Sequence, residues 1–305
     1  MRTARRMEPS MEPAAPDRPF IHDRRSLSYA NSFPDRWRRG AIRAVEWATA
    51  KPAILARVRE FERRGSPQGA AFWRGVLDVM GVEVLTPPEE VARIPATGPV
   101  VLVANHPHGL VDGLVIAELV GRVRPDWRVL SRSHLAALDP EASVRLLPVP
   151  FPEDEGAQAK MLEMRRQALA HLGRGELVAL FPSGVVASAR TPWGPAVEAD
   201  WNAFTAKLIR VSGATVVPMR FPGSNSRAYQ LAAHLSPTLR QGLLLHEVWR
   251  AMDRPQRPVV GHPIPPAELA PRLGDARALM AWLRARTLAL GQRPSSASSS
   301  GPGDS

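Results

Sequence analysis

The chain has 305 residues, 44% of them hydrophobic, so it is long enough to bury one substantial core. It contains no cysteine, which excludes disulfides, a thiolate nucleophile and zinc sites built on cysteine. The formal net charge is +11, and all but three of the 40 basic residues are arginine. A basic chain can bind nucleic acid or an anionic membrane surface. No nucleic-acid-binding motif accompanies the charge, so nucleic acid is not an expected partner.

Much of the charge lies near the amino terminus, where the first 64 residues carry 15 basic and eight acidic side chains. Residues 1–25 are rich in proline, arginine and acidic residues without periodicity, so we expect a disordered tail. An amphipathic helical element is predicted over 26–80. Its first helix runs from Pro34-Asp35 to about Ala50, and Pro52 starts a second.

Both helices have an apolar and a basic side. On the first, the apolar residues are Trp37, Ala41, Ala44, Val45 and Ala48, opposite Arg38, Arg39, Arg43 and Glu46, with Trp47 at the edge. On the second they are Ile54, Leu55, Val58 and Phe61, with Arg57, Arg59, Arg63 and Arg64 around them. The pattern fits a helix pair lying in a membrane interface, and equally a pair packed on the rest of the protein. Residues 70–80 predict a third helix, in the core.

From residue 81 onwards, short apolar runs alternate with amphipathic segments. Strands are predicted at 82–85, 100–104, 127–130, 146–149, 176–181, 215–221 and 259–264. Helices are predicted at 112–121, 155–172, 200–211, 226–234, 238–252 and 275–290. This alternation is typical of an α/β fold, with a mainly parallel sheet covered by helices on both faces. We expect the catalytic domain to span 81–291 and the Ser/Pro/Gly-rich residues 292–305 to form a flexible tail.

The strand predicted at 100–104 breaks at Asn105-His106-Pro107-His108-Gly109, and Asp112 follows near the start of a helix. The carboxyl ends of parallel strands are where α/β proteins build active sites. An aspartate bonded to one ring nitrogen of a histidine would fix its tautomer and leave the other nitrogen to take a proton from a hydroxyl. His106 with Asp112 is the first candidate dyad, and His108 with Asp112 is the second.

Two other interpretations of this stretch stay open. His106 could form a turn while Asp112 caps the helix, as aspartate often does. Alternatively, His106, His108 and Asp112 could hold the metal of a hydrolase, although further ligands are scarce among the eight histidines. We expect no metal. A basic membrane-surface protein without catalytic activity is a third possibility, against which the intact His106 and Asp112 argue.

The stretch resembles the first motif of the glycerolipid (lysophospholipid) acyltransferases, in which Asn-His is followed by an Asp. That family usually has four residues between His and Asp, whereas five separate His106 from Asp112. The longer spacing resembles a hemolysin-like bacterial branch linked to ornithine-lipid synthesis, whose motif runs Asn-His-Pro-aromatic-Gly-Gly-Leu-Asp/Glu-Gly. His108 stands at the aromatic position.

Two later stretches extend the resemblance, which covers roughly residues 80–265. Phe181-Pro182-Ser183-Gly184 stands where the family places Phe-Pro-Glu-Gly, with serine in place of the glutamate. The stretch 216–227, which includes Asn225, is similar to the fourth motif, and the similarity to the hemolysin-like branch continues over 235–240 and 243–247. Arg132, after the strand at 127–130, is a candidate for binding an acceptor headgroup or the donor's phosphopantetheine. His246 and Glu247 are interpreted as helix surface.

The resemblance implies an O-acyltransferase that moves a fatty acyl chain from an acyl thioester to the hydroxyl of a lysolipid. His106 would be the base, Asp112 would orient it, and backbone N–H groups near Gly109 would bind the oxyanion. The substrate-binding candidates are Asn105, Pro107, His108, Gly109, Arg132, Phe181, Pro182, Ser183, Gly184 and Asn225. The implied partners are acyl carrier protein or a coenzyme A thioester, used as a co-substrate without a further cofactor, a lysolipid and an anionic membrane surface. The chain has neither a spanning apolar run nor an apolar signal-peptide core in its first 16 residues, so we expect it in the cytoplasm, peripheral on the inner face of the membrane.

Overall fold

A six-stranded, mainly parallel sheet forms the centre of the computed structural model, which describes residues 27–33, 35–132, 140–150 and 154–292. The strand order is β3-β2-β4-β1-β7-β8, and only the β7–β8 pair is antiparallel. The bounds are β1 Val100–Ala104, β2 Trp127–Arg132, β3 Leu146–Val149, β4 Leu177–Leu180, β7 Thr215–Arg220 and β8 Val259–Val260. The predicted α/β class is confirmed. The disorder expected of residues 1–25 and the flexibility expected of 293–305 lie outside the described residues.

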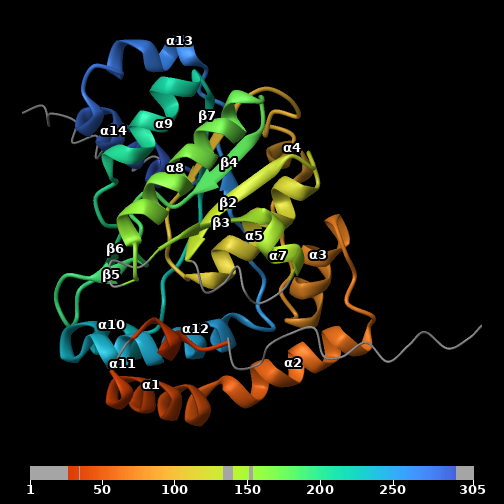
Figure 1. The fold of residues 1–305 in the computed structure, drawn as a ribbon, viewed down its shortest axis with the longest axis vertical. Coiled ribbons are helices and arrows are strands. Elements are labelled where there is room, and N and C mark those ends of the chain that lie inside the picture. Colours follow the sequence, from red (N-terminus) through yellow and green to blue (C-terminus); the bar gives the residue numbers. More distant parts are fainter. Residues whose placement is uncertain (1–26, 34, 133–139, 151–153, 293–305) are drawn as a thin grey trace, which may run out of the picture.

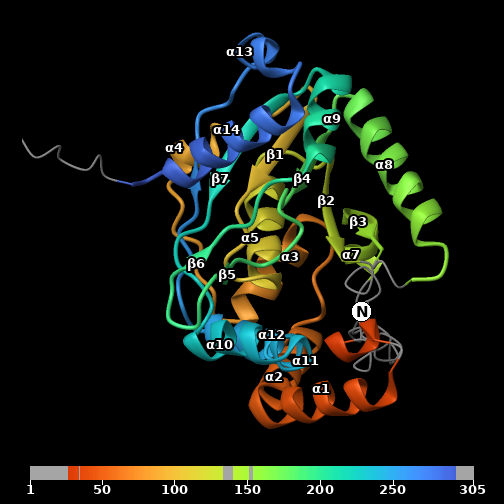
Figure 2. The same ribbon diagram turned by 90° about the vertical axis from the view of Figure 1, so that its left-hand side faces the viewer.

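Helices cover both faces of the sheet (Figures 1 and 2). Side chains of α3 (Ala70–Val79) and α5 (Leu110–Gly121) contribute to the core on one face. Those of α8 (Ala157–Gly173), α9 (Ala203–Ser212) and α14 (Ala276–Ala289) contribute to the core on the other. The remaining helices are η1 Tyr29–Ser32, α1 Arg36–Thr49, α2 Lys51–Arg63, α4 Pro88–Val91, α7 Pro140–Arg145, α10 Arg227–Leu235, α11 Pro237–Gly242, α12 Leu244–Ala251, α13 Pro266–Leu269 and η2 Ala270–Arg272.

The strand β1 lies between β4 and β7, and all five of its residues are buried. Because successive side chains of a strand point to opposite faces, Val100, Leu102 and Ala104 enter one core while Val101 and Val103 enter the other. A run without polar residues is what a strand covered on both faces requires. The loop that follows β1 is therefore anchored in the most buried part of the molecule.

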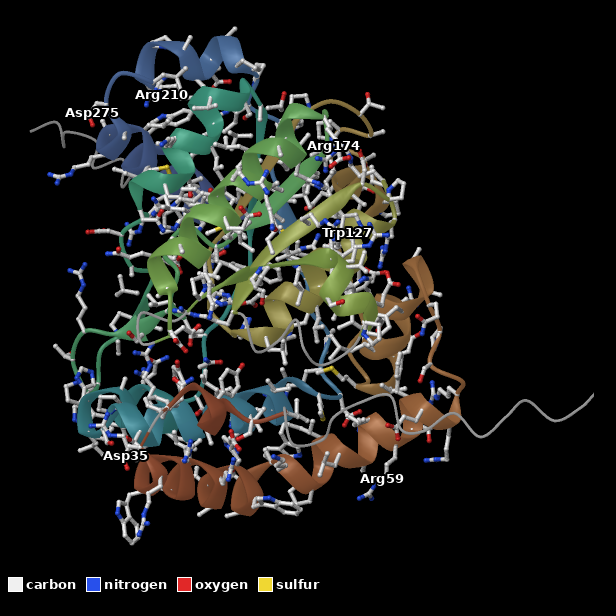
Figure 3. The ribbon with its side chains drawn as sticks, in the orientation of Figure 1. Asp35, Arg59, Trp127, Arg174, Arg210 and Asp275 are labelled. Carbon is white, nitrogen blue, oxygen red and sulfur yellow. The ribbon has the colours of Figure 1, made fainter. Side chains whose placement is uncertain are left out.

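The helices α1 and α2 lie below α10, α11 and α12, at the bottom of Figure 1. Asp35 lies at the start of α1 (Figure 3) and caps this helix by accepting a hydrogen bond from the amide of Trp37 at 2.9 Å. The predicted division of α1 into two sides is partly wrong. Ile42 and Glu46 are its buried residues, and Glu46 accepts hydrogen bonds from the Ser28 hydroxyl and the Tyr29 amide.

The apolar sides of the two helices face different surroundings. On α1, the side chains exposed to solvent include Trp37, Ala41, Ala44, Trp47 and Ala48. On α2, the apolar side faces inwards, and it consists of Ile54, Leu55, Val58 and Phe61. Within the described ranges, no helix is long and apolar enough to cross a membrane.

Several predicted elements differ from the observed ones. Residues 82–85 make one isolated bridge, Val84 to Gln256, instead of a strand. The helix expected at 238–252 is divided into α11 and α12. The sequence did not reveal a small antiparallel hairpin of β5 (Ser188–Ala189) and β6 (Ala196–Val197), because two-residue strands have no periodicity to detect.

Candidate active site

The loop between β1 and α5 holds the first motif at the carboxyl edge of the sheet. Asn105 follows the last residue of β1, and Leu110 is the first residue of α5. Gly109 precedes the helix with φ +82°, a left-handed conformation that glycine adopts without steric cost. Asp112, the third helical residue, is fully buried.

The Asp112 carboxylate accepts hydrogen bonds from two histidines and two backbone amides. Its Oδ2 lies 3.0 Å from His106 Nδ1, 2.9 Å from the His108 amide and 3.1 Å from the Gly109 amide. Its Oδ1 lies 2.9 Å from His108 Nδ1. Both rings therefore turn the same nitrogen towards the aspartate. When Nδ1 carries the proton, each Nε2 is left with a lone pair.

The local environment keeps Asp112 ionised. Burial acts to raise its pKa, but the charge and hydrogen bonds of His108 and His106 outweigh burial and lower that pKa to about 2. For His108, burial acts to lower the pKa, and the carboxylate of Asp112 reverses this, so the pKa of His108 is raised overall. An ionised carboxylate thus lies between two imidazoles and raises the pKa of one of them, His108.

His106 is held by three further contacts. Its ring stacks on Phe181, with centroids 3.8 Å apart and planes inclined by 22°. Its amide donates to Glu198 Oε2 at 3.0 Å, and its carbonyl accepts from the Ala187 amide at 2.8 Å. The stretch at 181–184 and the chain just after it therefore pack directly against the first motif.

A cavity of about 770 Å³ opens beside His106. Most of its wall is apolar, and α2, α3, α8, α11 and α12 all contribute side chains. Among the described residues, five of the predicted site residues line the cavity: His106, Gly109, Arg132, Phe181 and Gly184. A volume of this size is within the range of ordinary ligand pockets.

The two histidines differ in what their outer edges meet. His106 lines the cavity, whereas His108 is not among the described residues that line it. The Nε2 of His108 instead faces Gly223, where a Cβ atom would lie only 3.1 Å away. His106 is thus the histidine that a molecule in this cavity can reach.

The other predicted site residues do not line this cavity. Asn105 joins the first and fourth motifs, because its amide group donates to the Phe221 carbonyl at 2.9 Å and accepts from the Phe221 amide at 2.8 Å. Ser183 donates to the Val185 carbonyl within its own turn. Asn225, within the fourth motif, is buried, and its Nδ2 has no hydrogen-bond partner in the described chain. Pro107 and Pro182 are likewise not part of the described wall.

Sequence reasoning missed or misread two acidic residues of this region. Glu198 is buried and bridges the His106 amide and Trp201 Nε1. It lies 92 residues after His106, and no motif marks it. Glu247, interpreted as surface, is 4% exposed and accepts from the amide and hydroxyl of Ser226, so that interpretation is wrong.

The arrangement of acidic and histidine side chains also bears on the metal hypothesis. In the parts of the chain that the structure describes, no group of three or more His, Asp or Glu side chains is placed to hold a metal ion. The Nδ1 atoms of His106 and His108 are instead each hydrogen-bonded to Asp112.

A search of curated proteins gives no match. Among solved structures, the fold is similar to the crystal structure of the 1-acyl-sn-glycerophosphate (LPA) acyltransferase PlsC from Thermotoga maritima, at 15% identity and a TM-score of 0.43. That alignment covers 76% of this chain and 82% of the other. A family model described as "Acyltransferase" matches residues 59–254, which include the loop between β1 and α5, the turn at 181–184 and most of the cavity wall. Since this match spans well over half of the 305 residues, the chain belongs to that acyltransferase family.

Proposed function

We propose that this acyltransferase moves a fatty acyl chain from an acyl thioester to the hydroxyl of a lysolipid, with His106 as general base and Asp112 as its positioning partner. The observation that carries the proposal is the position of His106. Its Nδ1 is bonded to a buried, ionised carboxylate, and it lines a large apolar cavity. A base of this kind suits the activation of a hydroxyl on an apolar substrate.

The reaction can be written with these groups alone. The Nε2 of His106 removes the proton of the lysolipid hydroxyl as its oxygen attacks the thioester carbonyl. The tetrahedral intermediate then expels the thiolate, and the imidazolium of His106 returns the proton to the sulfur. Asp112 stabilises the imidazolium during both steps, because its charge lies 3.0 Å from Nδ1.

The oxyanion requires donors other than those first expected. The amides of His108 and Gly109 both donate to Asp112, so neither is available to bind an oxyanion. The first turn of α5 begins at Leu110, which lines the cavity. The leading N–H groups of a helix have no intrahelical acceptor and carry partial positive charge, so this turn is the better candidate.

The substrate classes follow from the shape and lining of the cavity. Apolar side chains of α2, α3 and α12 form much of the wall, which suits an acyl chain. The donor is an acyl thioester of acyl carrier protein or coenzyme A. The acceptor is a lyso-ornithine lipid, as the resemblance to the hemolysin-like branch implies, or a lysophosphatidic acid. Arg132 lies on the wall and donates to the carbonyl of Gly184, the last residue of the stretch at 181–184.

Peripheral membrane binding is part of this proposal, because a two-chain product has little tendency to leave through water. Trp37 and Trp47 are 75% and 56% exposed on α1, on a side that also carries small apolar residues. Arg36 and Arg38 are exposed on the same helix. Such a helix can lie in an anionic interface without spanning it.

The catalytic proposal is tested with a panel of lysolipid acceptors and labelled acyl thioesters of carrier protein and coenzyme A. The wild-type protein should form a two-chain lipid, and His106→Ala should not. Failure of the wild type with every lysolipid would overturn the proposal.

The membrane proposal needs a separate test. Deleting residues 1–64 would remove α2 and with it part of the cavity wall, so that truncation cannot isolate membrane binding. A Trp37→Ala/Trp47→Ala double variant leaves the wall intact. It should sediment less with anionic vesicles than the wild type does, and equal sedimentation would contradict the proposal.

A further inference from the structure

The charges on the cavity wall are all of one sign. Among the described residues that line the cavity, the basic side chains are Arg57, His106, Arg132, Arg165 and Arg240. No aspartate or glutamate is among these lining residues. A low-dielectric cavity strengthens the field of such groups. The wall therefore favours a ligand that is apolar over most of its length and anionic at one end.

The four arginines differ in their partners. Arg57 is paired with Asp253 at 2.6 Å. Arg165 is exposed and stacks over the ring of Phe204. Arg132 bonds the Gly184 carbonyl and has a further partner.

Arg240 has neutral partners only. Its Nε donates to the Tyr229 hydroxyl at 3.0 Å, and one Nη donates to the Val186 carbonyl at 3.2 Å. No carboxylate of the described chain lies within ion-pair distance of this partly buried guanidinium. A cation withdrawn from water without a counter-charge is costly, and an anion in the cavity would relieve that cost through charge-assisted hydrogen bonds.

Arg240 is connected to the dyad through Val186 in two ways. Val186, whose carbonyl accepts from Arg240, precedes Ala187, whose amide donates to the His106 carbonyl. The Val186 side chain also comes within 3.5 Å of the place where a Cβ on Gly109 would be. The guanidinium is thus fixed to the segment that contacts the first motif, on the wall of the same cavity.

From these observations, and resting on the proposed function, we propose that Arg240 binds the anionic headgroup of the lysolipid acceptor, a phosphate or a carboxylate. The headgroup of a lysolipid is only a few bonds from its reactive hydroxyl, so a cation beside the dyad fits it. The phosphate of a phosphopantetheine donor is separated from the thioester by a long arm and would lie farther away. The fork of a guanidinium suits either a phosphate or a carboxylate.

The test compares three acceptors with the same acyl chain: lysophosphatidic acid, lyso-ornithine lipid and the neutral monoacylglycerol. The wild type should use at least one of the two acceptors that carry a phosphate or a carboxylate better than monoacylglycerol, which carries neither. Arg240→Gln should raise KM for that acceptor about 10- to 100-fold, the scale of a lost charged hydrogen bond. It should leave kcat, the donor KM and the kinetics with monoacylglycerol nearly unchanged. Arg240→Lys should restore part of the preference.

Arg227→Gln is the matched control. Arg227 lies on α10 and also donates to a backbone carbonyl, that of Gly194, but it is not part of the described cavity wall. Its replacement should leave the preference between acceptors unchanged. If Arg240 only braces the loop through Val186, Arg240→Gln would lower kcat equally for charged and neutral acceptors, and the inference would be wrong.

Two outcomes separate this inference from the proposed function, the first with the wild type alone and the second with the Arg240 variants. Acylation of all three acceptors with equal efficiency would overturn the role of Arg240 but leave the acyltransferase proposal intact, even if the Arg240 variants did not fold. A change in donor KM instead of acceptor KM in Arg240→Lys or Arg240→Gln would assign the guanidinium to the donor phosphate and overturn the inference as well.

Discussion

The two sides of Asp112 are alike in chemistry and different in surroundings. On each side an imidazole turns Nδ1 to one carboxylate oxygen at about 3 Å. On one side, His106 stacks on Phe181 and lines the cavity. On the other, His108 packs against Gly223 and its pKa is raised by the carboxylate. The comparison teaches that a shared hydrogen bond does not select the base, because access to the substrate also has to be considered.

The largest expected effect is on the His106 side. His106→Ala removes the only histidine of the pair that lines the described cavity, so activity should fall by about 10²–10⁴. The fold should be retained, because the ring is at the surface of a cavity and not within a core. Rates of acyl transfer and circular dichroism spectra of the two proteins check this. A fully active His106→Ala together with an inactive His108→Ala would reverse the assignment.

The position of this dyad could be predicted from the sequence, because it depends on local features. A buried strand, a sharp break and a helix with aspartate in its first turn leave few alternatives for where His106 and Asp112 lie. Which histidine faces the cavity could not be predicted, since it depends on α2, α11 and the loop at 221–226. The inward side of α2 and the outward side of α1 have similar patterns, so periodicity alone could not separate them.

Glu198 and Arg240 show the same limit. Their contacts with the first motif or with the segment beside it depend on which loops the sheet brings to its carboxyl edge, and no spacing rule encodes that. The wrong prediction of a strand at 82–85 has a different cause. These residues have suitable β propensity, but within the described ranges they form only a single bridge, to Gln256.

The next effect concerns the shared carboxylate. Asp112→Asn keeps the shape but removes the charge that stabilises the imidazolium of His106, so activity should fall about 10- to 100-fold. The amide can keep its oxygen towards His106 and turn its NH₂ towards His108, whose ring can accept after a change of tautomer. His108→Phe would remove that acceptor. The double variant should therefore lose more than the sum of the two single free-energy changes, measured as a double-mutant cycle. Strict additivity would show that the two sides do not share the carboxylate in this way.

A smaller effect is expected from the residue behind His108. Gly223 has φ +92°, and an added Cβ would lie 3.1 Å from His108 Nε2. Gly223→Ala should lower the free energy of unfolding by about 1–2 kcal/mol because of the backbone strain alone. Activity should fall by less than ten-fold, because the displaced ring is not the base. Denaturant unfolding and rate measurements separate the two effects, and a loss as large as that of His106→Ala would contradict the comparison.

His108→Phe should have the smallest effect on the rate at high pH, but it should change how the rate depends on pH. Since the pKa of His108 is raised above its ordinary value of 6.5, its protonated form is favoured by the fold. Below that raised pKa, the imidazolium pairs with Asp112 and competes with His106 for the negative charge. As the pH rises through the raised pKa of His108, its imidazolium loses a proton. The charge of Asp112 is then directed to His106 alone, and the rate of acyl transfer should rise.

The charged groups that face His108 support the expected rise of the rate with pH. Glu247 acts in the same direction as Asp112, raising the pKa of His108, and the Asp112 carboxylate is already ionised because its own pKa is about 2. Phenylalanine cannot titrate, so the variant should lack the step above pH 6.5 while its rate at high pH stays within a few-fold of the wild type. The linkage with stability has the opposite sign, because the stability that the His108–Asp112 pair contributes is present below pH 6.5 and is lost as the pH rises through the raised pKa of His108. Rate profiles of both proteins from pH 5 to 9 check the prediction. An unchanged step in the variant would assign the titration to another group and leave His108 with a packing role only.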